Sequence, residues 1–154
     1  MARKRGRRAG LAAVGLLTAG TPLVLGAQPA GAAETFDEDE VELTIVTESG
    51  GDTIECFAHL TAIHDTDDAD QPTFDFGVGV GGDTAACIDT AVTMTASYKD
   101  QDGITRTTTV SSTGGPAAVV QGAYTNTTVT AEVFWSDCDT TVAVCEATLT
   151  ASPK

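Results

Sequence analysis

Apolar and polar residues alternate along most of the chain after residue 40. In the first such segment Val41, Leu43 and Ile45 fall on one face, and Glu42 and Thr44 fall on the other. A period of two is typical of a half-buried β-strand, and no segment keeps the 3.6-residue period of a helix. We expect strands over residues 41–47, 53–64, 73–80, 91–98, 104–111, 117–124, 127–135 and 141–151.

Residues that favour turns separate these segments. Residues 100–103 (Asp-Gln-Asp-Gly) stand between the segments 91–98 and 104–111 and predict a hairpin. Threonine occurs 24 times after residue 33, and this β-branched polar residue suits the solvent face of a sheet. About seven to eight short strands in about 110 residues predict an all-β, immunoglobulin-like two-sheet β-sandwich. A closed barrel is the alternative.

The first 33 residues have the composition of a secretory signal peptide. Five basic residues lie within residues 3–8, an apolar run covers 11–25, and small residues fill 30–33. The apolar run is interrupted by glycine and proline and is shorter than the roughly 20 residues that span a bilayer. We expect cleavage after Ala33, or after Ala32, and release of the protein outside a bacterial cell.

Charge changes the expected range of partners. Without residues 1–33 the chain keeps three basic residues against 22 acidic ones, a net charge of −19. So acidic a protein repels nucleic acid and anionic lipid, which argues against both as partners. We expect residues 34–40 to be an acidic, disordered lead-in and residues 41–154 to form a single β-sandwich domain.

Four cysteines, an even number, lie in the part that we expect outside the cell. There they predict two disulfides, with three pairings open in principle. Cys138 and Cys145 flank a short connection between strand-like runs, which favours their pairing and leaves Cys56 with Cys87. The competing pairing joins Cys56 to Cys145. No Cys-x-x-Cys pair occurs, which argues against a zinc site or a redox enzyme.

Two places suggest a ligand. Asp65, Asp67 and Asp70 lie in one acidic loop and could converge as oxygen ligands for calcium, although the glycine and final glutamate of an EF-hand are missing. A merely solvated loop is the plainer interpretation. Phe134 and Trp135 could form an exposed aromatic platform for a ligand, or one ring could belong to the core and the other to its rim. Apart from calcium, no cofactor is expected.

The segment from Trp135 to Leu149, with its short cysteine-bounded loop, resembles the neocarzinostatin family of chromophore-carrying apoproteins. The likeness covers only this segment, and Cys56 and Cys87 are spaced more widely than the second loop of that family. The resemblance implies, as one alternative, a carrier of a small ligand.

No catalytic constellation is evident in the sequence. A Gly-x-Ser-x-Gly motif is missing, and carboxylate pairs mean little in a chain with 22 acidic residues. We therefore expect a secreted, non-enzymatic binding or interaction module whose partner is an extracellular protein, a glycan or a small molecule. The alternatives are a small-ligand carrier or protease-inhibitor-like protein, and a small carboxylate-dependent hydrolase.

Overall fold

The computed structural model describes residues 3–4, 35–65, 72–122 and 125–153. Apart from one short 3₁₀ turn, η1 (Ala85–Cys87), the regular elements in these ranges are β-strands. They are β1 (Arg3–Lys4), β2 (Thr35–Val46), β3 (Thr53–Asp65), β4 (Thr73–Gly82), β5 (Thr90–Lys99), β6 (Thr105–Thr113), β7 (Ala117–Gln121), β8 (Thr125–Trp135) and β9 (Glu146–Ala151).

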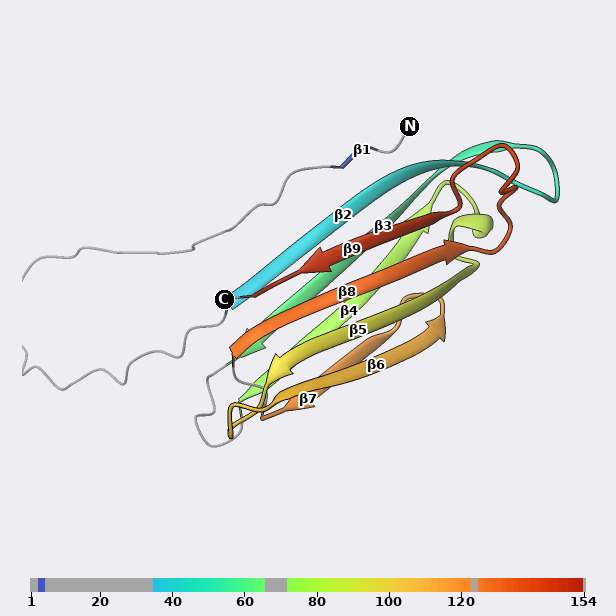
Figure 1. Cartoon of the computed structure of the whole chain (residues 1–154). Helices are drawn as coiled ribbons and strands as arrows, with labels where there is room; N and C mark the ends of the chain where they lie inside the picture. The colour runs from blue at the N-terminus through green and yellow to red at the C-terminus, as the bar shows by residue number, and fades with distance from the viewer. Residues whose placement is uncertain (1–2, 5–34, 66–71, 123–124, 154) are drawn as a thin grey trace, which may run out of the picture.

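The strands form two antiparallel sheets that pack face to face (Figure 1). The first sheet has the order β1-β2-β3-β4-β7, and the second has the order β6-β5-β8-β9. Without the two-residue β1, each sheet has four strands. The predicted all-β, immunoglobulin-like sandwich is therefore confirmed as an architecture, with both predicted disulfides in place.

The strands of this sandwich are connected in a different order from those of an immunoglobulin domain. The chain crosses between the sheets after β4, after β6 and after β7, which are its third, fifth and sixth strands when β1 is left out. An immunoglobulin constant domain crosses after its second, third and fifth strands. The long β2-β3-β4 meander therefore keeps in one sheet three strands that the immunoglobulin order divides between two.

The core lies where the predicted inward faces of the two sheets meet. Along β3, Cys56, Ala58, Leu60 and Ala62 are all buried, as the period of two predicted. The hydrophobic core of the described ranges runs from Leu43 to Ala151 and includes both disulfides. Residues 35–153 thus carry a complete core, to which β1 adds only a two-residue ladder. The largest fully buried side chains are Trp135, Phe74, Ile45, Leu60, Met94 and Leu149.

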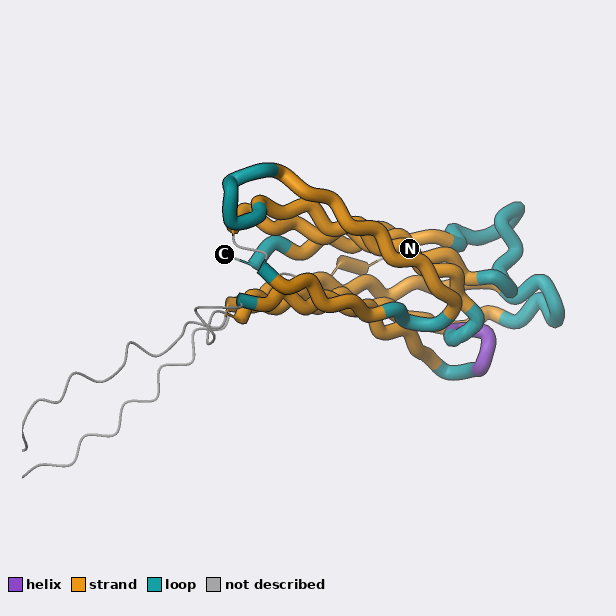
Figure 2. Tube along the Cα trace, turned by 90° about the horizontal axis from the view of Figure 1, so that it is seen from below, coloured by secondary structure: helices purple, strands orange, loops and turns teal. Residues whose placement is uncertain are grey.

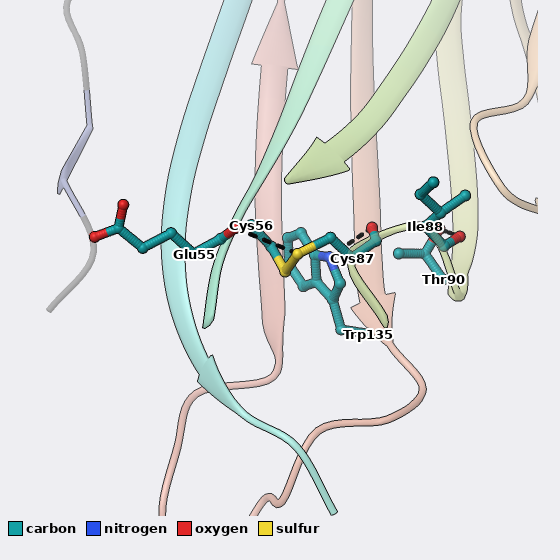
Figure 3. The surroundings of a disulfide bond; sticks show 6 residues. All are labelled: Glu55, Cys56, Cys87, Ile88, Thr90 and Trp135. Carbon is teal, nitrogen blue, oxygen red and sulfur yellow. Dashed lines mark hydrogen bonds between the residues drawn. A yellow bond between two sulfur atoms is a disulfide. The ribbon is translucent and has the colours of Figure 1, made fainter. Parts of the chain in front are cut away.

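A disulfide and a tryptophan fasten the two sheets together. Cys56 of β3 is bonded to Cys87 in η1, on the connection that leads from β4 to β5 in the other sheet. Trp135 of β8 is fully buried, and its Nε1 donates a hydrogen bond to the Cys87 carbonyl oxygen at 3.3 Å. Figure 3 shows the indole beside the bridge. The covalent link and the largest core side chain therefore meet at one point.

The acidic lead-in is ordered in the structure, which corrects the expectation for residues 35–40. They belong to β2, which is paired with β3 from Thr35 opposite His64 to Val46 opposite Thr53. The reason is that two carboxylates point inward and bind the edge of the other sheet. Asp39 accepts a hydrogen bond from the Thr150 backbone nitrogen at 3.0 Å, and Asp37 accepts one from Ser152 at 2.7 Å.

Replacing Asp39 by alanine should destabilise the fold. Asp39 is 5% exposed, so its loss leaves the backbone N–H of Thr150 without this acceptor in a largely dry position. We expect Asp39→Ala to lower the free energy of unfolding by about 1–3 kcal/mol. Denaturant unfolding followed by the fluorescence of Trp135 measures it. Glu40→Ala, on the opposite face of β2, is the control and should stay within about 0.5 kcal/mol; equal losses in both would contradict the role of Asp39.

Gly82 should tolerate no side chain. Its φ is +152°, and a Cβ there would overlap the Cys87 Sγ and the Glu55 carbonyl oxygen. We expect Gly82→Ala to cost more than about 2 kcal/mol and to raise the fraction of free thiol at Cys56 and Cys87. At Gly79 a Cβ would meet nothing within 4 Å, so Gly79→Ala should change stability by less than about 1 kcal/mol. Thiol titration and denaturant unfolding of both variants test the difference.

Candidate functional site

Four connections gather at one end of the sandwich, which we call the loop end (Figure 2). The antiparallel strand order places them together, because β2, β4, β6 and β8 all run toward this end. Hydrogen bonds tie the connections to one another. The Ser136 nitrogen donates to the Asp89 carbonyl of the connection before β5 at 2.9 Å, and the Gly114 nitrogen donates to the carbonyl of Thr90, the first residue of β5, at 3.0 Å. The loop end consists of residues 47–52, 83–89, 114–116 and 136–145.

The most constrained part of the loop end is the segment closed by the Cys138–Cys145 disulfide, which we call the disulfide loop. The Cα atoms of the two cysteines are 5.6 Å apart. Inside the loop, the Asp139 carboxylate accepts hydrogen bonds from the backbone nitrogen of Thr141 at 2.9 Å and from its hydroxyl at 2.6 Å. The backbone nitrogens of Val142 and Ala143 donate to the Asp139 carbonyl. The loop therefore folds around one aspartate.

The disulfide loop is also fastened to its surroundings. The Asp139 nitrogen donates to the Val46 carbonyl at the end of β2, at 2.8 Å, and the Trp135 nitrogen donates to the Cys145 carbonyl at 3.0 Å. Just before the loop, the Asp137 carboxylate accepts bonds from the Ser49 nitrogen at 3.0 Å and from the Ser49 hydroxyl at 2.6 Å. The backbone of the disulfide loop is thus hydrogen-bonded to both sheets.

This fixed backbone presents apolar side chains to solvent. Val142 is 65% exposed and Val144 is 62% exposed, and Ile88 on the neighbouring connection is also exposed. A loop that is rigid before it binds loses little conformational entropy on binding, and apolar groups at its surface gain from leaving water. The disulfide loop can therefore serve as a pre-formed contact surface.

Hydrogen bonds lower the pKa of both carboxylates that hold the loop. The Thr141 hydroxyl and backbone nitrogen hold the pKa of Asp139 below its ordinary value. The Ser49 hydroxyl and backbone nitrogen lower the pKa of Asp137 in the same way. Each set of donors favours the charged carboxylate because it stabilises the negative form.

The structure separates the two rings expected as an aromatic platform. Trp135 is 0% exposed, whereas Phe134 is 41% exposed on the outer side of β8. Neighbouring residues of a strand point to opposite faces, so both rings cannot face one ligand. The structure agrees with the alternative interpretation, in which the Trp135 ring belongs to the core and the Phe134 ring lies at its rim.

The expected calcium loop lies mostly outside the described residues. Asp65 ends β3 and is half-buried, but Asp67 and Asp70 fall in the range 66–71, which the structure does not describe. Among the residues that it does describe, no group of three or more histidines, cysteines, aspartates or glutamates could hold a metal ion. Calcium binding by the acidic loop stays a prediction.

Comparisons with protein families, curated proteins and solved structures find no match to this chain. The loop end is therefore proposed as a candidate site from its geometry alone. In the described ranges no helix has the length and apolar character needed to cross a bilayer.

Sequence reasoning located the cysteines but missed the surface that they create. The segment 141–151 was expected to be a strand, whereas β9 begins only at Glu146. The residues before it turn back on Asp139, so Val142 and Val144 lie on a loop at the end of the sandwich, exposed to solvent, and not on the outer face of a strand. An aspartate followed by Thr-Thr just inside a cysteine was the available signal, because aspartate binds backbone groups two residues ahead.

The Asp139 contact should weaken in acid. Because its folded pKa lies below the unfolded value of about 3.9, its stabilising effect is complete above that pH. The effect is lost as the pH falls through the folded pKa. We expect the amide proton shift of Thr141, followed by NMR, to titrate with a midpoint below 3.9. Asp139→Asn should abolish this titration, and a midpoint at or above the ordinary value would contradict the interaction.

Proposed function

We propose that the protein is a secreted, non-enzymatic binding module that contacts an extracellular partner through its disulfide loop. The observation that carries the proposal is a disulfide-closed, hydrogen-bonded loop that holds Val142 and Val144 in solvent. The basic and apolar leader supports secretion, and two disulfides are consistent with an oxidising compartment outside the cell.

The chemistry of the loop indicates the kind of partner. Its exposed valines need an apolar pocket, and Asp137, Asp139 and Glu146 lie near them in the sequence of a chain whose net charge is −19 after the leader. A protein with an apolar cleft and a neutral or basic rim fits both features. We propose such an extracellular protein, ahead of a glycan or a small molecule.

Protease inhibition is a second candidate for the same surface. A protease-inhibiting loop has to remain extended and rigid while it occupies the cleft. The disulfide loop has a closed, hydrogen-bonded backbone that meets the second requirement, but its turn around Asp139 does not meet the first. Inhibition of a secreted protease that is lost in Val144→Asp would favour this candidate. Rapid cleavage between Cys138 and Cys145 without inhibition would count against it.

A carboxylate-dependent hydrolase has less support. Asp37 and Asp39 are the inward-facing carboxylates of β2, and each accepts a hydrogen bond from the backbone of the β9 region. These bonds give both carboxylates a structural role at the side of the sandwich. We therefore propose a protein that binds without catalysing a reaction.

Placing charge on the disulfide loop should abolish partner binding. We would cross-link the tagged, secreted protein in culture and identify attached proteins by mass spectrometry. A partner of the loop should be captured by the wild type and reduced at least about tenfold by the double variant V142D/V144D, because two apolar contacts are replaced by charges.

The control for that experiment is T105D/T107D, which adds the same charge on exposed positions of β6. This control variant should still be cross-linked to the partner as efficiently as the wild type. Equal capture by the wild type and V142D/V144D, or no cross-linked partner at all, would contradict the proposed contact surface.

A further inference from the structure

The edge strand β2 accepts an additional strand in this structure. The short strand β1 pairs with it in antiparallel register, with Arg3 opposite Glu42 and Lys4 opposite Val41 (Figure 1). This β1 belongs to the segment that we expect to be removed on export. Once that segment is gone, β2 becomes the edge of the first sheet. The backbone groups that pair with β1 then become available to another strand.

The other edges of the sandwich are less suited to strand addition. On β9, the backbone nitrogen of Thr150 is already bonded to Asp39, and just beyond the strand that of Ser152 is bonded to Asp37. On the other side of the sandwich, β7 has only five residues. The β6 edge is nine residues long, but it carries mainly threonine and serine with one arginine, so it has no negative face for a basic strand.

In the described part of the chain, and apart from the pairing with β1, a backbone hydrogen bond covers the β2 edge only at its far end. The carbonyl of Val46 accepts a bond from Asp139 of the disulfide loop, which closes the strand at its last residue. Before that point β2 is a long, regular strand, paired with β3 at every residue from Thr35 to Val46. A regular strand of this length is a good template for a further one.

Charge decides which strand fits. Glu38, Glu40 and Glu42 occupy alternate positions of β2 and therefore lie on one face, the outer face of the sheet. A strand with basic residues at every second position would place them opposite these glutamates. A second copy of β2 would instead bring glutamate against glutamate, which is unfavourable.

We propose that the β2 edge of the exported protein binds an extended basic peptide segment of another protein by β-strand addition. The leader is a built-in occupant of the same edge, since residues 3–8 hold five basic residues and β1 already pairs there. The recognition combines main-chain hydrogen bonds with the negative outer face of β2. This surface meets the disulfide loop only at Val46 and does not include the exposed valines of that loop.

The test uses a short synthetic peptide in which arginine and lysine alternate with threonine, labelled for fluorescence anisotropy. It is added to the chain of residues 34–154, which contains the complete core, and to the full-length chain. We expect the shorter chain to bind and the full-length chain to bind several-fold more weakly, because β1 competes. Equal affinities would contradict a shared edge.

Two N-methylated peptides separate strand pairing from simple charge attraction. Each is methylated on alternate residues, one on the backbone nitrogens that face β2 and the other on those that face solvent. Strand addition requires that one of the two peptides loses binding and the other keeps it. If both bind equally, or if both fail, the peptide is not held as a strand and the proposal is overturned.

Variants of the protein locate the surface. E38Q/E40Q/E42Q should weaken peptide binding roughly tenfold, because the outer face of β2 loses three negative charges, including that of Glu38, whose carboxylate also lies 3.3 Å from His59 Nε2. The control D89N/E132Q/E146Q removes the same number of charges from exposed positions elsewhere and should change affinity less than about twofold. Equal weakening would show a general charge effect and overturn the proposal. So would self-association of the 34–154 chain through β2, detected by sedimentation and by amide exchange.

Discussion

The Cys56–Cys87 bridge, with Trp135 packed beside it, is the constraint on which the sandwich depends. Aromatic residues make up only 5% of the chain, so few large side chains are available to hold two sheets together. Closing a loop with a sequence separation of 31 stabilises the fold by about 4 kcal/mol in the chain-entropy model. That is a large share of the roughly 5–15 kcal/mol that usually stabilises a domain. The close approach of Gly82 to Cys87 shows how closely the surrounding backbone has adapted to the bridge.

The fold was largely predictable because its signal is local. A strand with one buried face must alternate, and the inward residues of β3 and β5 followed that rule through their length. Sheet order and crossings were not predictable, since they depend on which strands meet in space. Residues 35–40 were misjudged for a similar reason. Their acidic composition suggested solvent, but Asp37 and Asp39 bind backbone nitrogens more than 100 residues away in sequence.

The candidate site was predictable only in outline. Cysteine spacing identified the loop between Cys138 and Cys145, but the exposure of Val142 and Val144 depends on how the chain turns around Asp139. Valine in a two-residue pattern is typical of a strand, and only the contacts of the folded loop exclude that structure here. The bond between Ser49 and Asp137 joins residues 88 apart in sequence, so no local pattern could have indicated it.

The strand order also places the two ends of the folded part far from the loop end. β2 begins and β9 ends at the same end of the sandwich, where Ser152 is bonded to Asp37, and the loop end lies at the opposite end. Anything joined to either end of the folded part is therefore held at a distance from the disulfide loop. A tag, a tether to a solid support or a fused domain can be attached there while the loop end stays open to solution.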